Sequence, residues 1–177
     1  LPANRGLAEA LTAGLAACAN DIVARMDADD VSLPERFARQ LPLLAAGADL
    51  VGSGMYEFAG DDTILAQRTP PAGRDRLAAY ARFHDPFNHP TVVYRRSVVE
   101  AAGGYLDLPL MEDYWLFARM IQAGAATENL ADPLVMYRVD AGSYARRGGL
   151  RLFRSELRLQ AMFRRSGFTS RSQWLRN

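Results

Sequence analysis

Apolar residues recur along the chain with two alternating spacings, one typical of helices and one typical of strands. Residues 5–19 carry a leucine at every fourth position with alanines between them, which predicts a helix that buries one face. The short apolar run at residues 22–24 follows this helix and is typical of a buried strand. The start of the chain is therefore expected to fold as a helix followed by a strand.

A second helix is expected shortly after this strand. Ser32 and Glu35 have the spacing of a capping box, and Pro34 is tolerated in a first helical turn. The helix should end near Gly47, and Pro42 lies deep enough within it to produce a kink. Three residues at helical spacing are expected to face the core: Phe37, Leu41 and Leu44.

The remainder of the chain continues to alternate. Further strands are expected at residues 50–52, 55–58, 63–66, 91–94 and 134–137. Further helices are expected at residues 75–83, 97–103, 112–124 and 148–165, and Ser97 and Glu100 form a second capping box. Strands that alternate with helices, with one hairpin inserted, predict an α/β sheet domain.

The composition is that of one globular domain. The chain has 177 residues, of which 49% are hydrophobic and 23% charged, and a chain of this length buries a substantial core. No run of about 18 apolar residues occurs, so the sequence predicts no membrane-spanning helix. The single cysteine excludes an internal disulfide and a cysteine-based metal cluster.

The net charge of +1 hides an uneven distribution. Residues 1–137 carry 11 arginines against 18 acidic residues, whereas residues 138–177 carry 10 arginines against two acidic residues. The chain therefore has an acidic main part and a basic tail. The acidic part would repel the phosphates of a nucleic acid, so nucleic-acid binding is not expected.

The basic tail is expected to form an amphipathic helix, for which two interpretations stay open. Its arginines and apolar residues lie near one helical face: Arg147, Arg151, Arg154 and Arg158, beside Leu150, Phe153 and Leu157. Such a helix can rest on an anionic membrane surface. It can also pack on the domain and leave a solvated arginine face.

An acidic cluster, Asp27, Asp29 and Asp30, follows the strand predicted at residues 22–24. Open α/β sheets bind ligands at the carboxyl ends of strands, and a divalent cation is the usual group that offsets crowded carboxylates. Mg²⁺ or Mn²⁺ suits these oxygen ligands and retains waters and substrate phosphates. The alternative is a solvated acidic loop that caps the next helix.

A second acidic pair, Glu112 and Asp113, opens the helix predicted at residues 112–124. The helix dipole stabilises acidic residues in a first turn, which is a sufficient structural reason for the pair. Asp113 can instead serve as a general base if the fold brings it near the acidic cluster. A metal ion and a separate base together can catalyse the displacement of a nucleoside diphosphate. The cation offsets the charge that grows on the leaving phosphate, and the base accepts the proton of the attacking hydroxyl.

The order of these segments resembles that of bacterial family 2 glycosyltransferases of the GT-A fold. The resemblance spans residues 4–140, and its specificity rests on the combination, since each piece alone is weak. The matching pieces are Asn4-Arg5-Gly6-Leu7, Ala24-Arg25-Met26-Asp27-Ala28-Asp29-Asp30, Pro34-Glu35-Arg36 with Gln40, Asn88-His89-Pro90-Thr91, Gly103-Gly104-Tyr105, Glu112-Asp113-Tyr114-Trp115-Leu116 and Tyr137-Arg138.

The resemblance implies a GT-A-like (Rossmann-like) mixed sheet flanked by helices, and it implies roles for individual residues. Asp29 is implied as a ligand of the divalent metal, and Asp27 as a contact to the metal or to the ribose of the donor. Asp113 is implied as the base of an inverting transfer, with Glu112 beside it and facing the acceptor.

The resemblance also implies residues on the donor and acceptor sides of the site. The donor side would include Asn4, Gly6, Arg25 and Arg138. The acceptor side would include His89, Gly104 and Tyr105. Two of these have structural alternatives: His89 as a hydrogen-bonded loop histidine, and Arg138 as a surface ion pair rather than a diphosphate contact.

Three departures from the family pattern modify the expectation. The family begins with a strand and a nucleotide-binding loop that this sequence lacks, so we expect an N-terminally truncated GT-A domain over residues 1–145, followed by a basic helical tail over residues 146–177. The Gln-x-x-Arg-Trp element of processive synthases is absent, which favours adding one sugar at a time. Asp140 stands where some relatives carry a histidine, so a third metal ligand there stays open.

The resemblance, taken with these residues, implies a metal-dependent, inverting glycosyltransferase of cell-envelope or exopolysaccharide biosynthesis. It would move a sugar from a nucleoside-diphosphate donor to a saccharide or lipid-linked acceptor, in the cytoplasm or at the inner face of the cell membrane. Two alternatives stay open. One is a metal-dependent phosphatase or phosphotransferase, although Val31 stands where the Asp-x-Asp-x-Thr pattern needs threonine. The other is a non-catalytic domain that binds glycans or partners.

Overall fold

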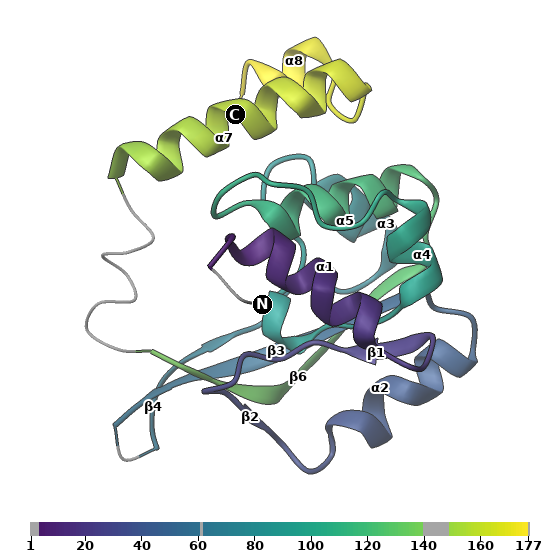
Figure 1. Ribbon diagram of the computed structural model, residues 1–177, viewed down its shortest axis with the longest axis vertical. Coiled ribbons are helices and arrows are strands. Elements are labelled where there is room, and N and C mark those ends of the chain that lie inside the picture. Colours follow the sequence, from purple (N-terminus) through teal and green to yellow (C-terminus); the bar gives the residue numbers. More distant parts are fainter. Residues whose placement is uncertain (1–3, 61, 140–148, 177) are drawn as a thin grey trace.

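A mixed six-stranded sheet lies at the centre of the computed structural model, which describes residues 4–60, 62–139 and 149–176 (Figure 1). Its strands are β1 (Ile22–Ala24), β2 (Val31–Ser32), β3 (Leu50–Ala59), β4 (Thr63–Arg68), β5 (Val93–Arg95) and β6 (Thr127–Arg138). The helices are α1 (Leu7–Ala17), α2 (Arg36–Ala45), α3 (Arg74–Tyr80), the short 3₁₀ helix η1 (His89–Thr91), α4 (Arg96–Ala101), α5 (Glu112–Gln122), α7 (Gly149–Ser166) and α8 (Arg171–Trp174). The predicted α/β class is confirmed.

The sheet has the strand order β1-β5-β3-β6-β2, with β4 also paired to β3. The central strand β3 runs parallel to β6 over most of its length. On the other edge of β3, β5 pairs with its first two residues and β4 pairs with its last five. Among the described strands, none therefore pairs with residues 52–54 on that edge.

Side chains of the loop before β5 fill this three-residue gap. The Ser53 N–H donates to Thr91 Oγ1 at 2.9 Å. The side-chain amide of Asn88 donates to the Ser53 carbonyl at 3.0 Å. The loop that carries His89 is thereby hydrogen-bonded to the middle of the sheet.

Helices cover both faces of the sheet, with α2 on one face and α1, α3, α4 and α5 on the other (Figure 1). Neighbouring strand residues point to opposite faces. Leu50 and Tyr94 are paired and pack with the side chains of α1 and α5. The next pair, Val51 and Val93, packs against Leu44 of α2.

Helix α2 buries a different face from the one predicted. Phe37 and Leu41 are 45% and 41% exposed. The buried residues are instead Arg36 and Gln40, together with Leu44 as predicted. The helix therefore turns two long polar side chains toward the sheet, and the prediction from apolar spacing was wrong for two of its three residues.

Backbone carbonyls at strand ends explain this choice of face. The Arg36 guanidinium donates to the Arg25 carbonyl at 2.8 Å and to Gln40 Oε1 at 3.1 Å. The Gln40 amide in turn donates to the Val51 and Thr91 carbonyls at 3.1 and 2.8 Å. These carbonyls lie where β1, β5 and β3 stop pairing, and a buried carbonyl without a donor is costly.

Neither predicted capping box forms. Ser32 belongs to β2, which pairs with β6, and α2 begins only at Arg36. Ser97 instead uses its backbone N–H to donate to the Asp21 carboxylate at 2.8 Å, and the N-cap residue of α4, Arg95, makes no side-chain cap. In both places pairing with a distant segment replaces the local cap that the sequence suggests.

Most other predicted elements are present with shifted boundaries. The strands predicted at 50–52 and 55–58 are one strand, β3, and the last strand begins at Thr127 rather than at residue 134. Helix α2 includes Pro42 and is followed by Gly47 at a φ of 105°. In α1, Leu15 is buried as predicted, whereas Leu7 is 48% exposed.

Helix α7 packs on α5 through aromatic rings. The centroid of the Phe163 ring lies 5.2 Å from that of Tyr114 and 5.9 Å from that of Trp115. The boundary predicted between domain and tail, at residue 145, falls outside the described residues. Within the described residues, every helix is too short or too polar to cross a lipid bilayer.

Candidate active site

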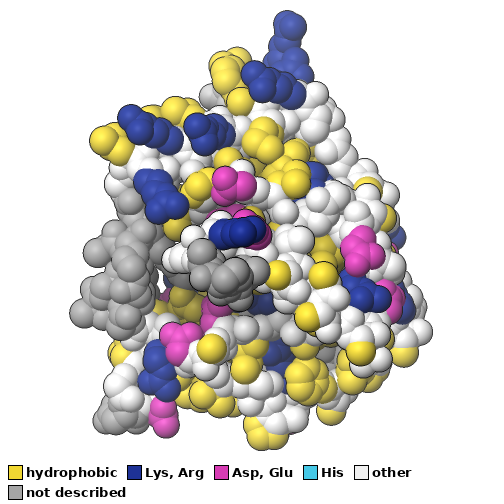
Figure 2. All heavy atoms as spheres, in the orientation of Figure 1, with side chains coloured by type: hydrophobic (Ala, Val, Ile, Leu, Met, Phe, Trp, Pro, Cys, Tyr) yellow, Lys and Arg dark blue, Asp and Glu magenta, His cyan; other side chains and the backbone are white. Residues whose placement is uncertain are grey.

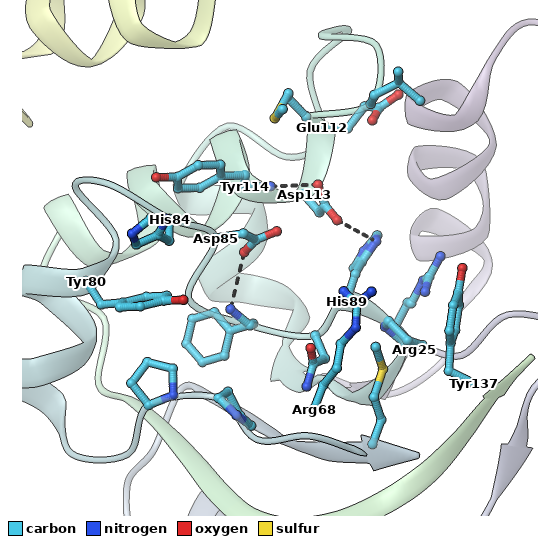
Figure 3. A pocket seen from close by; sticks show the side chains of 18 of the residues that line it. Arg25, Arg68, Tyr80, His84, Asp85, His89, Glu112, Asp113, Tyr114 and Tyr137 are labelled. Carbon is cyan, nitrogen blue, oxygen red and sulfur yellow. Dashed lines mark hydrogen bonds and ion pairs between the residues drawn. The ribbon is translucent and has the colours of Figure 1, made fainter. Parts of the chain in front are cut away.

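A cleft of about 920 Å³ opens beside the loop that carries His89 (Figure 3). Its walls come from the segment after β1, the end of β4 with two following prolines, the loop before η1, the start of α5, and α7. Five of the predicted site residues line it: Arg25, Asp27, His89, Glu112 and Asp113. The fold thus gathers three segments that are far apart in the sequence.

Asp113 lies in the first turn of α5 with its carboxylate directed toward His89 (Figure 3). Its Oδ2 is 3.4 Å from His89 Nδ1, and its Oδ1 accepts the Tyr114 N–H at 2.8 Å. The side chain is 25% exposed, so it can be reached from the cleft. A held and accessible carboxylate at a helix start is suited to act as a general base.

Glu112 does not join this arrangement. In Figure 3 its carboxylate points away from His89, whereas the neighbouring carboxylate of Asp113 points toward it. Burial is the main cause that raises the pKa of Glu112, and the charge of Asp113 adds to the rise. The acidic pair predicted from the sequence therefore divides into two differently placed groups.

Asp85 is a site residue that the sequence did not indicate. Burial of its carboxyl group, together with the charge of Asp113, raises the pKa of Asp85 well above its usual value. One of its oxygens accepts the Phe87 N–H at 3.2 Å. A raised pKa favours the protonated form of this carboxyl group, and in that form it can donate a hydrogen bond into the cleft. In the sequence, Asp85 before a proline indicated only a loop.

Arg25 and Asp27 form a tight ion pair on the same cleft. The Arg25 guanidinium donates to both carboxylate oxygens of Asp27, at 3.0 and 2.5 Å. Arg25 is 9% exposed, and it lies beside His89 in Figure 3. A bidentate pair fixes the direction of both groups, so Asp27 is held in place at the cleft wall.

The other two members of the acidic cluster lie off the cleft lining. Asp29 is exposed, and its carbonyl accepts a hydrogen bond from Arg138 Nε at 3.1 Å. Asp30 is buried and accepts the backbone N–H of Arg138 at 2.9 Å through Oδ1. Burial, with the charges of Asp27 and Asp29, raises the pKa of Asp30 to about 6.

These carboxylates suit a divalent cation that the substrate helps to hold. Oδ2 of Asp30 is buried and has no hydrogen-bond partner among the described residues. The same part of the chain contains no group of three His, Cys, Asp or Glu side chains able to hold a metal by itself. Mg²⁺ commonly takes only one or two carboxylates and completes its shell with phosphates and water. The donor set fits a cation of this kind.

Several residues implied by the resemblance do not line the cleft: Asn4, Gly6, Asp29, Gly104, Tyr105 and Arg138. Asn4 Oδ1 accepts the Gly6 N–H at 3.1 Å in front of α1. The Gly104 carbonyl accepts from the Arg119 guanidinium at 2.6 Å. Asp140, considered as a third metal ligand, lies outside the described residues.

Sequence reasoning did not single out five further residues of the cleft, Arg68, Tyr80, His84, Asp85 and Glu156. Tyr114 and Tyr137 also line it; they stand in pieces that match the family, but they were given no role. Arg68 reaches the cleft from β4 and pairs with the buried Glu57 at 2.5 Å. Glu156 comes from α7, so the segment predicted as a separate tail contributes to the wall. No motif marks Arg68 or Glu156, because only the hairpin and the packing of α7 bring them to the site, and Tyr80, His84 and Asp85 reach it from the end of α3 and the loop that follows.

Comparisons with known proteins identify relatives of this chain. Residues 1–103 match the family model described as glycosyl transferase family 2. The chain is 38% identical over 162 residues to an uncharacterized glycosyltransferase of Haemophilus influenzae, which covers 90% of the chain and 60% of that relative. It is 36% identical to the amylovoran biosynthesis glycosyltransferase AmsE of Erwinia amylovora, over 95% of the chain and 65% of that relative.

A third relative is the UDP-Gal:alpha-D-GlcNAc-diphosphoundecaprenol beta-1,3-galactosyltransferase of Escherichia coli, 31% identical over 100% of the chain and 65% of its own length. The chain thus spans 60–65% of the length of these three relatives. Among solved structures, the mannosyltransferase PcManGT from Pyrobaculum calidifontis, in complex with GDP-Man and Mn²⁺, matches with a TM-score of 0.62 over 92% of the chain and 44% of its own. At 18% identity this likeness concerns the fold, and it confirms the expected GT-A-like sheet.

Proposed function

The chain belongs to glycosyltransferase family 2, and from that premise we propose that it transfers a sugar from a nucleoside-diphosphate donor to an acceptor hydroxyl, with inversion. One observation carries the proposal: Asp113, His89 and the Arg25–Asp27 pair lie on one cleft. A proton acceptor and a fixed charged pair thus stand together in a cavity large enough for a small-molecule ligand.

The relatives support the class of acceptor and the biosynthetic setting. AmsE is named for amylovoran biosynthesis, and the Escherichia coli relative is named for a diphosphoundecaprenol-linked acceptor and a UDP-Gal donor. We therefore propose a saccharide or lipid-linked acceptor in the assembly of a bacterial surface polysaccharide. PcManGT is described with GDP-Man, so the relatives do not agree on one donor nucleotide.

In the proposed reaction Asp113 accepts the proton of the acceptor hydroxyl. The acceptor oxygen then forms a bond to the anomeric carbon while the bond from that carbon to the phosphate oxygen of the donor breaks. Attack from the side opposite the leaving group inverts the configuration. Asp27 and Asp29 would hold Mn²⁺ or Mg²⁺, which when bound offsets the charge on the departing diphosphate.

The first experiment is calorimetric titration of this chain with UDP, dTDP and GDP, each with and without Mn²⁺. Binding that requires Mn²⁺ and selects one nucleotide supports the donor site and identifies the donor class. If none of the three nucleotides binds under either condition, the proposed donor site is contradicted. Binding that is equally strong without the metal would retain the donor site and remove the metal from it.

Asp29→Ala is expected to weaken Mn²⁺-dependent nucleotide binding by about 100-fold or more, because it removes a proposed metal ligand. The measurement is the same titration at fixed Mn²⁺. Asp132→Ala is the matched control, since Asp132 is also an exposed aspartate and its partner is Arg39, away from the cleft. Equal affinities in the two variants would show that Asp29 does not bind the metal, and Asp27 and Asp30 would then be substituted in turn.

The outer face of α7 supports a second part of the proposal, contact with an anionic membrane surface. Figure 2 shows apolar and arginine side chains intermixed over this helix. Leu150, Phe153 and Leu157 are 74%, 57% and 55% exposed, whereas Leu159 on the opposite side is fully buried. Among the described residues nothing covers this second apolar stripe, and such a stripe beside arginines suits the interface of a lipid bilayer.

Replacing both Arg154 and Arg158 by glutamine is expected to weaken binding to vesicles that contain phosphatidylglycerol by about 30-fold, since each basic residue near such a surface contributes about 1 kcal/mol. Co-sedimentation at low and high salt measures the effect, and salt should weaken binding by the wild type. Arg5→Gln is the control, because Arg5 is exposed and paired with Glu9 on α1. Wild-type protein that fails to sediment with these vesicles would contradict the membrane contact.

A further inference from the structure

A chain of four polar side chains runs from the cleft into the core. His89 Nδ1 lies 3.4 Å from Asp113 Oδ2, and His89 Nε2 lies 3.0 Å from the Tyr105 hydroxyl. The Tyr105 hydroxyl lies 3.4 Å from the hydroxyl of Tyr94. His89, Tyr105 and Tyr94 are all buried, so the chain meets the cleft mainly at Asp113.

The chemistry of these groups fixes the direction of the two hydrogen bonds in the chain and of the polar contact between His89 Nδ1 and Asp113. Ionised Asp113 can only accept, so His89 must carry its proton on Nδ1. The Nε2 of a neutral imidazole must then accept, and the Tyr105 hydroxyl is the donor that faces it. Tyr105 is left to accept from the Tyr94 hydroxyl. All the protons in the chain therefore point toward Asp113.

The environment keeps each group in the protonation state that this direction requires. Burial, with a smaller effect from the charge of Arg25, lowers the pKa of His89 well below its usual value, so the ring stays neutral. Burial raises the pKa of both Tyr105 and Tyr94, so their hydroxyls keep their protons. The His89 ring also packs edge-on against Phe117 at 5.8 Å between centroids, which holds its plane.

We infer that His89 is a positioning residue for Asp113: its Nδ1–H holds one carboxylate oxygen toward the cleft, and the Tyr105 hydroxyl selects the tautomer in which that N–H exists. This inference rests on the proposed role of Asp113 as the base. It also gives two residues a role other than contact with the acceptor, because both ring nitrogens of His89 face protein groups and Tyr105 does not line the cleft.

Other charged groups face Asp113 and set the direction of the expected pH effect. Glu112 from α5 interacts with it as a like charge and favours its protonated form, and Asp85 from the preceding loop does so when it is ionised. Arg25, Asp27, Arg68 and Glu156, from the remaining walls, line the same cleft. The donor on His89 favours the ionised form, because it binds the charged carboxylate. Without this donor the pKa of Asp113 should rise.

The tautomer of His89 can be read directly by ¹⁵N nuclear magnetic resonance of protein labelled at histidine. The chain has only two histidines, and the exposed His84 serves as internal reference. We expect His89 to carry its proton on Nδ1 and to remain neutral between pH 6 and 8, and we expect Tyr105→Phe to move proton density to Nε2. A wild-type His89 that is protonated on Nε2 or on both nitrogens would overturn the inference, with no substrate needed.

The kinetic test compares His89→Ala with His89→Asn, since an asparagine amide can replace the Nδ1–H donor. The probe is UDP release from UDP-galactose with Mn²⁺, measured against pH. His89→Ala should shift the acidic side of the pH profile of kcat/KM to higher pH by about one unit, which lowers kcat/KM about tenfold at a given pH on that side. His89→Asn should restore most of this loss. Tyr56→Phe, which also removes a hydroxyl but lies off the cleft, is the control.

The outcomes separate this inference from the proposed function. An acid limb that stays unchanged in His89→Ala, with activity lowered equally at all pH values, would reduce His89 to a structural residue. If Asp113→Asn keeps wild-type turnover, the proposed base is wrong, whichever tautomer His89 adopts. If wild-type enzyme does not turn over UDP-galactose, the donor is wrong, and the tautomer of His89 still decides the inference.

Discussion

Asp113→Asn is expected to lower kcat by about 10³-fold while leaving nucleotide affinity and stability nearly unchanged. Asparagine has the same shape and can still accept the Tyr114 N–H that Oδ1 now accepts at 2.8 Å. It cannot take a proton, and removing a general base typically costs between about 10² and 10⁴ in rate. Asp113 lies away from the Asp27–Asp30 cluster in the sequence and comes from another wall of the cleft, so the donor site should be intact.

The measurement pairs steady-state kinetics with calorimetry of nucleotide binding. Glu112→Gln is the matched variant, because Glu112 precedes Asp113 in the same helical turn and points away from His89 (Figure 3). Its substitution should lower kcat far less than that of Asp113. Equal losses in the two variants, or a loss confined to Glu112→Gln, would transfer the role of base away from Asp113.

Arg36→Ala is expected to lower the free energy of unfolding by about 4 kcal/mol, because breaking a buried charged hydrogen-bond network commonly costs about 3–5 kcal/mol. Arg36 is 1% exposed, and it donates to the Arg25 carbonyl and to Gln40. Alanine would leave these acceptors buried without a donor and would leave a cavity. Burial lowers the pKa of Arg36 only to about 10, so the side chain is charged at neutral pH.

Urea unfolding followed by circular dichroism measures this loss, and Arg39→Ala is the control. Arg39 lies one turn along the same helix, and its ion pair with Asp132 at 2.7 Å is about half exposed on both sides. An exposed pair of this kind contributes less than about 1 kcal/mol. If both variants lose the same stability, the buried network is not what holds α2 on the sheet.

Helix α2 shows where prediction from the sequence stops. Its C-terminal end was nearly right, since the helix ends at Ala45 and Gly47 follows, whereas it begins at Arg36 and not directly after Ser32. The prediction of its buried face was wrong. The helical spacing of Phe37 and Leu41 indicates only which residues are apolar, and it does not indicate which backbone carbonyls need a hydrogen-bond donor. The strands that require those donors come from parts of the chain up to 56 residues away from Arg36. No local pattern can carry that information.

The candidate site was predictable to a similar extent. Arg25, Asp27 and Asp113 stand beside a strand end or a helix start, where short motifs are visible, and all three line the cleft. The sequence contained no sign that His89 would contact Asp113, 24 positions later, rather than an acceptor. Asp85 joins the site only because the loop before η1 folds over it, and Glu156 joins it only because α7 does. Their chemistry depends on neighbours that only the fold supplies.

The gap in the edge of β3 bears on which parts of the protein can move. Residues 52–54 of a central strand, left open, would be a template for the strand of another chain. Here the loop that carries His89 closes that edge, through Asn88 and Thr91 bonded to Ser53. Swinging this loop outward would expose both the edge and the core beneath it, so its amides should exchange with solvent only in rare, large openings. The wall of the cleft behind Asp113 is therefore expected to stay fixed.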